Sequence, residues 1–150
     1  MIKDNQELQE PKEEMIPILI NNSYGGFGLS EEAIELYNKK KSALDPTNVK
    51  HEKYFGYTRQ RIDPILIEVF HELGDRINEK YSKIECEQIP KKYANYYHIQ
   101  DYDGKEWFDI EYELYVIDQI QSILNDIFLS SDEKIEKIQL VITNRYKTRR

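Results

Sequence analysis

The sequence predicts an α+β fold in which a small antiparallel sheet of roughly three or four strands is covered by about four helices. Three observations support this prediction. Several short runs are rich in branched residues or alternate between apolar and polar positions, as strands do. Longer segments repeat apolar residues every three or four positions, as amphipathic helices do. An Asp-Gly pair also separates two of the alternating runs, which is the strongest short signal for a hairpin.

The 150 residues fit one domain with short extensions at both ends. Residues 1–14 are polar and charged, so we expect a flexible charged arm there. The single α+β domain is predicted over residues 15–146. Residues 147–150 are a basic tail, whose simplest interpretation is that it complements the negative end of the last helix.

The domain begins with an apolar run at Met15–Ile20 that predicts a strand, in which Pro17 favours an edge position. A loop with three glycines follows at Asn21–Gly28. Ser30 then predicts a helix N-cap, because its hydroxyl can accept a hydrogen bond from a backbone N–H of the first turn. Between Ser42 and Gln60 no periodicity is visible, and this stretch is predicted to be a long loop.

A strong helix is predicted at Asp63–Asn78, because Asp63 is a favourable N-cap and Pro64 suits the first helical position. Gly74 weakens this helix near its end. Three strands are then expected, in sequence order, at Lys83–Ile89, at Tyr96–Tyr102 and at Glu106–Ile110, and Asp103-Gly104 forms the turn between the last two.

Two helices are predicted at the C-terminal end, at Leu114–Phe128 and Ser131–Tyr146. Ser130 and Glu133 match a capping box at the start of the second helix. Both carry apolar stripes that must be buried. Two arrangements remain open at this point. Either both stripes fold back onto the sheet of the same chain, or part of this surface packs against another copy to form a homodimer.

The charge and cysteine content exclude several functional classes. A net charge of −7 disfavours general nucleic-acid binding, except through the basic C-terminal tail. Cys86 is the only cysteine, so no intramolecular disulfide forms, and an intracellular location is expected. Its neighbours Glu85 and Glu87 raise the pKa of the thiol rather than activate it. No signal peptide and no membrane-spanning run is visible.

Three segments contain residue types that carry chemistry. The glycine loop Tyr24–Gly28 precedes a helix start, where a phosphate is often held, but the P-loop lysine is missing and a tight turn is the simpler interpretation. The acidic residues around the Asp-Gly turn resemble ligands of a divalent cation, but Lys105 stands where an oxygen ligand is needed. Arg59 and Arg61 suit an anion or, more simply, the acidic hairpin.

Three blocks of the sequence resemble a group of small uncharacterised proteins of large DNA viruses and tailed phages. These blocks are Tyr24–Ser30, the segment from Arg61-Ile62-Asp63-Pro64 to Glu72-Leu73-Gly74, and Tyr102–Trp107. Together they cover roughly half of the chain, without the first fourteen residues, the Ser42–Gln60 loop and the last two helices. The resemblance implies a viral setting and no particular reaction.

The resemblance also suggests that the three blocks meet at one end of the sheet, with Arg61 paired to Asp103 or Glu106. Such a cluster is either a binding surface or only a structural part of the fold. The candidate binding residues are Tyr24, Gly26, Phe27, Arg61, Asp103, Glu106 and Trp107.

The sequence favours a non-catalytic interaction protein of a large DNA virus, packaged in the virion or acting as a replication accessory. The expected partner is a protein, for which a second copy of this chain is one candidate, and the expected location is the host cytoplasm or the virion. The alternative is a small ligand-binding protein or enzyme that uses the glycine loop and the acidic hairpin. We expect no cofactor, no metal and no catalytic residue, because no nucleophile–base set and no metal-ligand spacing is visible.

Overall fold

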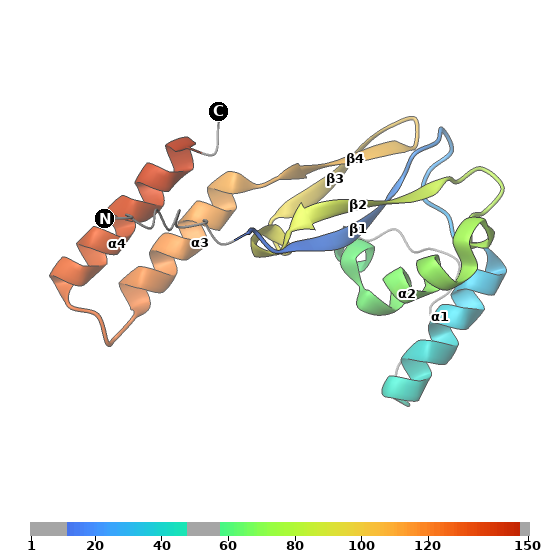
Figure 1. Ribbon diagram of the computed structural model, residues 1–150, viewed down its shortest axis with the longest axis horizontal. Helices are drawn as coiled ribbons and strands as arrows, with labels where there is room; N and C mark the ends of the chain where they lie inside the picture. Colours follow the sequence, from blue (N-terminus) through green and yellow to red (C-terminus); the bar gives the residue numbers. More distant parts are fainter. Residues whose placement is uncertain (1–11, 48–57, 148–150) are drawn as a thin grey trace, which may run out of the picture.

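Two antiparallel strand pairs and four α-helices make up the described fold (Figure 1). The structure, a computed structural model, describes residues 12–47 and 58–147. The predicted α+β class with four helices is confirmed. The predicted single sheet is wrong, because the four strands form two separate two-stranded sheets.

The second sheet bonds the first through a side chain at the end of β1. β1 (Met15–Asn21) and β4 (Lys105–Ile110) are in contact. The backbone N–H of Asn21 donates to Oε2 of Glu106 at 2.9 Å. A carboxylate of β4 is thus the partner of this N–H, and residue periodicity does not reveal such a contact.

The β1–β2 pair is covered on both faces. β2 (Ile84–Pro90) runs antiparallel to β1, with Asn21 opposite Ile84. Successive strand residues point to opposite faces, yet four consecutive residues of β1 are buried. These residues are Ile18, Leu19, Ile20 and Asn21.

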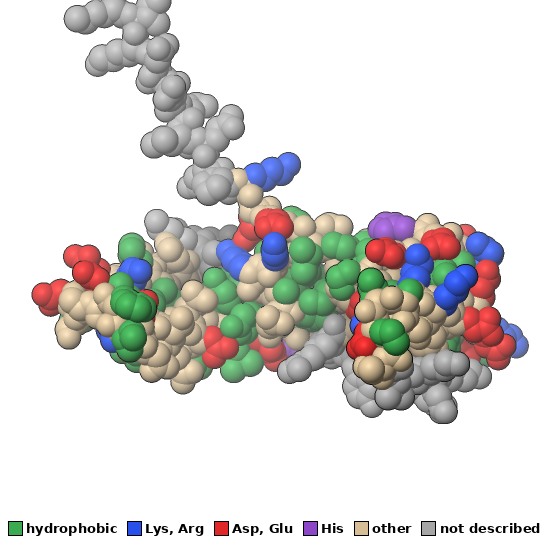
Figure 2. Space-filling model, turned by 90° about the horizontal axis from the view of Figure 1, so that it is seen from below, with side chains coloured by type: hydrophobic (Ala, Val, Ile, Leu, Met, Phe, Trp, Pro, Cys, Tyr) green, Lys and Arg blue, Asp and Glu red, His purple; other side chains and the backbone are tan. Residues whose placement is uncertain are grey.

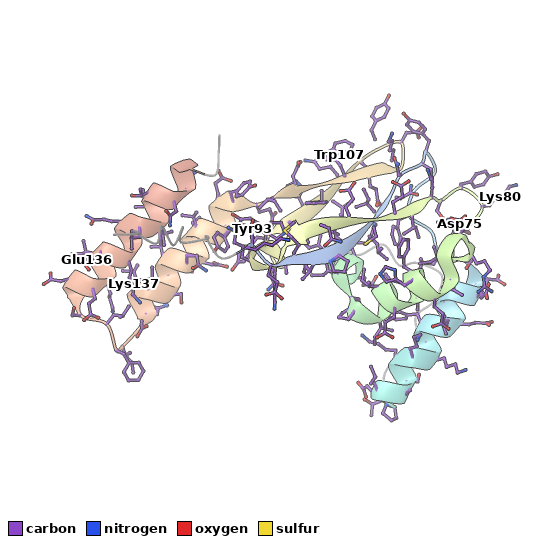
Figure 3. All side chains as sticks on the ribbon, viewed as in Figure 1. Asp75, Lys80, Tyr93, Trp107, Glu136 and Lys137 are labelled. Carbon is purple, nitrogen blue, oxygen red and sulfur yellow. The ribbon has the colours of Figure 1, made fainter. Side chains whose placement is uncertain are left out.

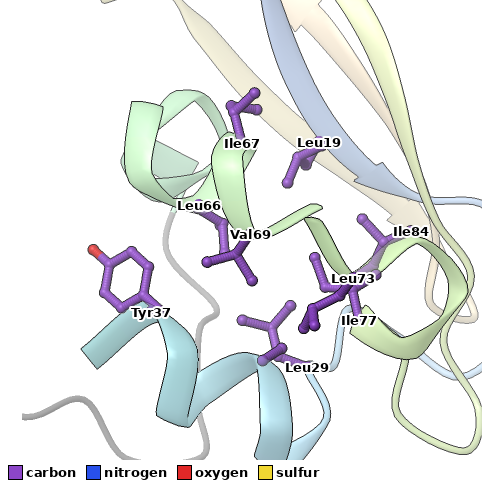
Figure 4. Packing of buried hydrophobic residues seen from close by; sticks show 10 residues of the cluster. Leu19, Leu29, Tyr37, Leu66, Ile67, Val69, Leu73, Ile77 and Ile84 are labelled. Atoms are coloured by element: carbon purple, nitrogen blue, oxygen red, sulfur yellow. The ribbon is translucent and has the colours of Figure 1, made fainter. Parts of the chain in front are cut away.

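Helices α1 (Glu31–Leu44) and α2 (Pro64–Leu73) cover the first face (Figure 4). The predicted caps are confirmed, since Oγ of Ser30 accepts from Ala33 N and the Asp63 carboxylate accepts from Ile65 N. Ten buried residues form the core between these helices and β1–β2, and they include Leu19, Leu29, Tyr37, Leu66, Val69, Ile77 and Ile84.

The predicted extension of the second helix to Asn78 is wrong. α2 ends at Leu73 because Gly74 adopts a φ of +54°, and a short 3-10 turn at Gly74–Ile77 follows. This turn directs Ile77 into the core. A second 3-10 turn at Thr58–Ile62 precedes α2, and the part of the predicted long loop from 48 to 57 lies outside the described residues.

The pair formed by β3 (Tyr97–Tyr102) and β4 packs on the second face of β1–β2. The register places Tyr102 opposite Lys105, so only Asp103 and Gly104 connect the strands, and both have positive φ. Ile18, Ile89, Tyr93 and Tyr97 form the buried centre of this second core. Tyr93 belongs to a third 3-10 turn at Lys91–Tyr93.

Helices α3 (Tyr112–Asn125) and α4 (Ser131–Lys147) form an antiparallel hairpin that projects from one end of the strands (Figure 1). The predicted cap is confirmed, since Oγ of Ser130 accepts from Glu133 N at 3.2 Å. Within the described residues, no helix is sufficiently long and apolar to cross a bilayer.

Candidate functional site

The structure brings the three resembling blocks together around one buried ion pair. Arg61 donates from Nη1 to Oε2 of Glu106 at 2.6 Å and from Nη2 to Oε1 at 2.9 Å. Only 3 % of the Arg61 side chain and 8 % of the Glu106 side chain are exposed. The predicted arginine–acid pair therefore forms, and Glu106 rather than Asp103 is the partner.

Phe27 of the glycine loop packs against the arginine of this pair. The Arg61 guanidinium lies over the Phe27 ring, 3.5 Å from its centroid, and Nη1 also donates to the Leu19 carbonyl at 3.4 Å. Glu106 in turn accepts from Asn21 N. A buried charge pair is tolerated when most of its hydrogen-bonding capacity is used; here both Nη atoms of Arg61 are bonded, and only its Nε is buried without a partner among the described residues. The arrangement joins β1, β4, the glycine loop and the turn before α2.

Asn21 is a site residue that the sequence interpretation missed. Its side chain is fully buried. Nδ2 donates to the carbonyls of Ser23 and Gly104, at 2.8 and 2.7 Å, and Oδ1 accepts from Lys83 N at 2.8 Å. One amide therefore links three loops. The only signal in the sequence is an asparagine at the end of an apolar strand, and that signal is too common to identify it.

The glycine loop and the β3–β4 connection pack directly against each other. Gly25 N donates to the Asp103 carbonyl at 3.1 Å. A Cβ atom built on Gly104 overlaps the backbone nitrogens of Gly25 and Gly26. The backbones are thus too close for a bound phosphate between them. This proximity explains the glycines in terms of packing and positive φ, with Gly26 at φ +90°.

The remaining candidate residues lie at the surface of this cluster. Asp103 is in the turn with a φ of +51°. Tyr24 is 64 % exposed and its ring is 5.9 Å from Lys105 Nζ. Trp107 lies on the outer side of β4 and is 44 % exposed (Figure 3). Of the seven candidates, Phe27, Arg61 and Glu106 thus contact each other in the cluster. The exposed aromatic residues Tyr24 and Trp107 lie at its edge.

The other candidate groups do not assemble into a reactive site in the described part of the chain. No group of three or more His, Cys, Asp or Glu side chains is placed to hold a metal ion there. Asp109 accepts a hydrogen bond from Gln100 at 2.8 Å, and Glu111 lies 3.5 Å from His98. Burial, assisted by Glu87, raises the pKa of the Cys86 thiol, which keeps it protonated.

A cavity of about 260 Å³ lies between the 3-10 turn at Lys91–Tyr93 and helices α3 and α4. Tyr112 and Tyr115 contribute to its wall, and both contact the Tyr93 ring edge to face, at centroid distances of 5.2 and 5.0 Å. The two cations at its margin have carboxylate partners, since Lys92 is 2.7 Å from Glu13 and Arg145 is 3.2 Å from Glu113. The sequence interpretation did not identify this cavity.

Eight of the fourteen exposed large hydrophobic side chains of the described residues lie on the α3–α4 hairpin, and Leu140 lies on a different side of α4 from Ile135 and Ile142. α3 has no buried residue. Figure 2 shows hydrophobic and acidic side chains exposed on this end of the molecule. The exposed apolar residues of α3, the connecting loop and α4, with their exposed fractions, are Leu114 (50 %), Ile117 (48 %), Leu124 (53 %), Ile127 (86 %), Phe128 (91 %), Ile135 (55 %), Leu140 (61 %) and Ile142 (43 %).

In comparisons with known proteins, no family model, no curated protein and no solved structure matches this chain.

Proposed function

We propose that this chain is a non-catalytic interaction protein whose α3–α4 hairpin carries the binding surface. The observation that supports the proposal is that Leu114, Ile117 and Leu124 of α3, a helix with no buried residue, are each about half exposed. Exposed apolar surface of this extent is typical of sites that bind other proteins. The strands with α1 and α2 then act as a rigid base for the hairpin.

In this proposal the protein belongs to a large DNA virus. It is either packaged in the virion or acts in the host cytoplasm as a replication accessory. This part rests on the resemblance of the Tyr24–Ser30, Arg61–Gly74 and Tyr102–Trp107 blocks to viral proteins. The structure contributes a reason for these blocks to occur together, since each supplies part of the cluster around the Arg61–Glu106 pair.

The alternative function, a ligand-binding protein or enzyme that uses the glycine loop and the acidic hairpin, receives less support. Its two most suitable charged groups, Arg61 and Glu106, neutralise each other. Calorimetric titration with calcium, magnesium and zinc separates the two functions. We expect no micromolar binding; micromolar binding that is lost in Asp101→Asn would favour the alternative.

Affinity purification from infected cells tests the preferred function with a matched pair of variants. Leu124→Glu places a charge on the proposed surface, whereas Leu140→Glu places the same charge at an exposed position elsewhere on α4. We expect the bound proteins to be lost with Leu124→Glu and kept with Leu140→Glu. Equal recovery with both variants would contradict the proposed surface.

A further inference from the structure

The exposed apolar residues of α3 and α4 repeat the same spacing. On α3, Ile117 and Leu124 lie three residues before and four residues after the half-buried Ile120. On α4, Ile135 and Ile142 stand in the same relation to the half-buried Ile138. In an α-helix, both steps rotate a side chain by roughly 40–60° in the same sense away from the central residue.

This shared spacing places the exposed residues of both helices on one face of the hairpin. The helices α3 and α4 contact each other, and we place their contact line near Ile120 and Ile138, which belong to the partly buried residues of each helix. Since α3 and α4 are antiparallel neighbours, equal rotations from that line turn both sets of side chains toward the same side. We call this surface the apolar face; its residues are Leu114, Ile117, Leu124, Ile135 and Ile142.

The opposite side of the hairpin is the one that contacts the rest of the chain. The residues of α3 and α4 that border the 260 Å³ cavity next to Tyr93 include Tyr112, Tyr115, Gln119 and Asn144. On the helical wheel of α3, Gln119 lies roughly 160° from Ile117. The apolar face therefore points away from Tyr93 and from the strands, and the described part of the chain leaves it about half exposed.

We infer that the apolar face binds the apolar face of a second copy of this chain, about a two-fold axis, to form an antiparallel four-helix bundle. This inference rests on the proposed function and names the partner. About half of each of five large side chains is exposed, roughly 450 Å², and Ile127 and Phe128 at the tip add roughly 350 Å². The sum is close to the ~800 Å² that each partner contributes to a standard interface.

The position of Gln121 supports a two-fold, antiparallel pairing. Gln121 lies four residues after Ile117 and three before Leu124, and it is the polar residue in the middle of the exposed α3 stripe. When two α3 helices pack antiparallel with Ile117 facing Leu124 of the second copy, Gln121 lies within roughly 1 Å of the axis, next to its own copy. Two glutamine side chains can then hydrogen-bond to each other across the axis, which fixes the register.

The charges favour this partner over a lipid surface. Residues 111–147 hold seven acidic and four basic residues, whereas helices that bind anionic membranes are rich in Lys and Arg. α4 begins with Asp132 and Glu133, which an anionic lipid surface would repel, and Arg145 near its other end is paired with Glu113 of the same chain.

Light scattering after size exclusion at micromolar concentration tests the inference. We expect a mass near 36 kDa, twice the chain mass of 18.0 kDa, for the wild type and for Leu140→Glu. Leu124→Glu is expected to weaken association at least about 100-fold and to give the monomer mass. An unchanged circular dichroism spectrum controls for folding, and Ile117→Glu provides a second variant if Leu124→Glu does not fold.

Cysteine cross-linking in a Cys86→Ser background tests the geometry. Gln121→Cys is expected to form a disulfide-linked dimer at least about tenfold faster than Ser122→Cys, because the neighbouring exposed position points about 100° away from the axis. Equal rates for the two variants would overturn the two-fold pairing.

Three results would overturn the second copy as the partner. They are a wild-type monomer at all concentrations, dissociation by Leu140→Glu as complete as by Leu124→Glu, and co-sedimentation of the wild type with phosphatidylserine vesicles that depends on Leu124. If the wild type is a monomer but Leu124→Glu still loses partners in the affinity purification, only the dimer fails and the proposed function stands. If neither experiment distinguishes the variants, both fail.

Discussion

Helices α2 and α3 are both amphipathic, but they lie in very different surroundings. α2 has ten residues and buries four of them, Leu66, Ile67, Val69 and Leu73. α3 has fourteen residues and buries none. The core around α2 is complete within one chain, whereas Leu114, Ile117 and Leu124 of α3 remain about half exposed. The difference indicates that the base of the molecule is stabilised internally and that the hairpin presents surface to a partner.

The largest expected effect comes from the buried ion pair in the base. Arg61→Ala leaves the Glu106 carboxylate buried without its partner, and we expect the free energy of unfolding to fall by about 3–5 kcal/mol in urea denaturation. Lys91→Ala, which removes an exposed partner of Glu14, is the control and is expected to leave stability unchanged.

A double variant sharpens this result. Arg61→Met combined with Glu106→Leu removes both charges, so much of the stability lost in Arg61→Ala should return. A loss below about 1 kcal/mol for Arg61→Ala alone would contradict the central role given to the pair.

The next largest effect compares one residue type in the two regions. Leu66 is fully buried under α1, and Leu140 on α4 is 61 % exposed. We expect Leu66→Ala to reduce the free energy of unfolding by about 3 kcal/mol through loss of packing and creation of a cavity. Leu140→Ala should stay within about 0.5 kcal/mol. Similar losses from both, measured by thermal unfolding, would remove the contrast between base and hairpin.

A smaller effect is expected from the close contact between the glycine loop and the β3–β4 connection. Gly104→Ala combines a positive φ with overlap onto the Gly25 and Gly26 backbone, so a loss of roughly 1–3 kcal/mol is expected. Gly26 also has a positive φ, but a Cβ atom added there would meet nothing within 4 Å, so Gly26→Ala should cost roughly 1 kcal/mol. Equal melting temperatures for wild type and Gly104→Ala would show that the two loops separate readily.

The smallest effect is a pH dependence within the base. Burial of Asp63 opposes its ionisation, but hydrogen bonds from Tyr37 Oη, from Ile65 N and from Lys41 outweigh this and hold its pKa below the usual value. Because the pKa is lowered in the folded state, the stabilisation is complete above about pH 4 and is lost as the pH falls through the folded pKa.

Urea denaturation between about pH 2 and pH 6 measures this contribution. Asp63→Asn keeps an N-cap acceptor but does not ionise, so it should lack this part of the acid-induced loss. An identical pH dependence in both proteins would show that other carboxylates cause the loss.

Local signals in the sequence predicted much of the secondary structure. Ser30, Asp63 and Ser130 each accept the first-turn hydrogen bond that their position before an apolar stripe predicts. These interactions span two or three residues, so they can be recognised without knowing the fold. The end of α2 at Gly74 was misjudged because the helical spacing continues to Ile77, although the backbone there becomes a 3-10 turn.

The candidate site was predicted in part. The arginine–acid pair follows from an excess of acidic residues and from the resembling blocks, and it forms between Arg61 and Glu106. The central position of Asn21 was not predictable, because its partners Ser23, Lys83 and Gly104 are distributed over 83 residues of the chain. The same applies to the cavity beside Tyr93, whose walls come from a 3-10 turn and two helices.

The sequence alone predicts the α+β class, the helix starts and the absence of an intramolecular disulfide, because each depends on nearby residues or on composition. Tertiary contacts determine that four strands form two sheets, that Glu106 rather than Asp103 pairs with Arg61, and that the α3–α4 hairpin leaves one apolar face exposed. These features depend on which distant groups meet. The Glu106 carboxylate of β4, for example, accepts a hydrogen bond from the last N–H of β1, 85 residues away in the sequence.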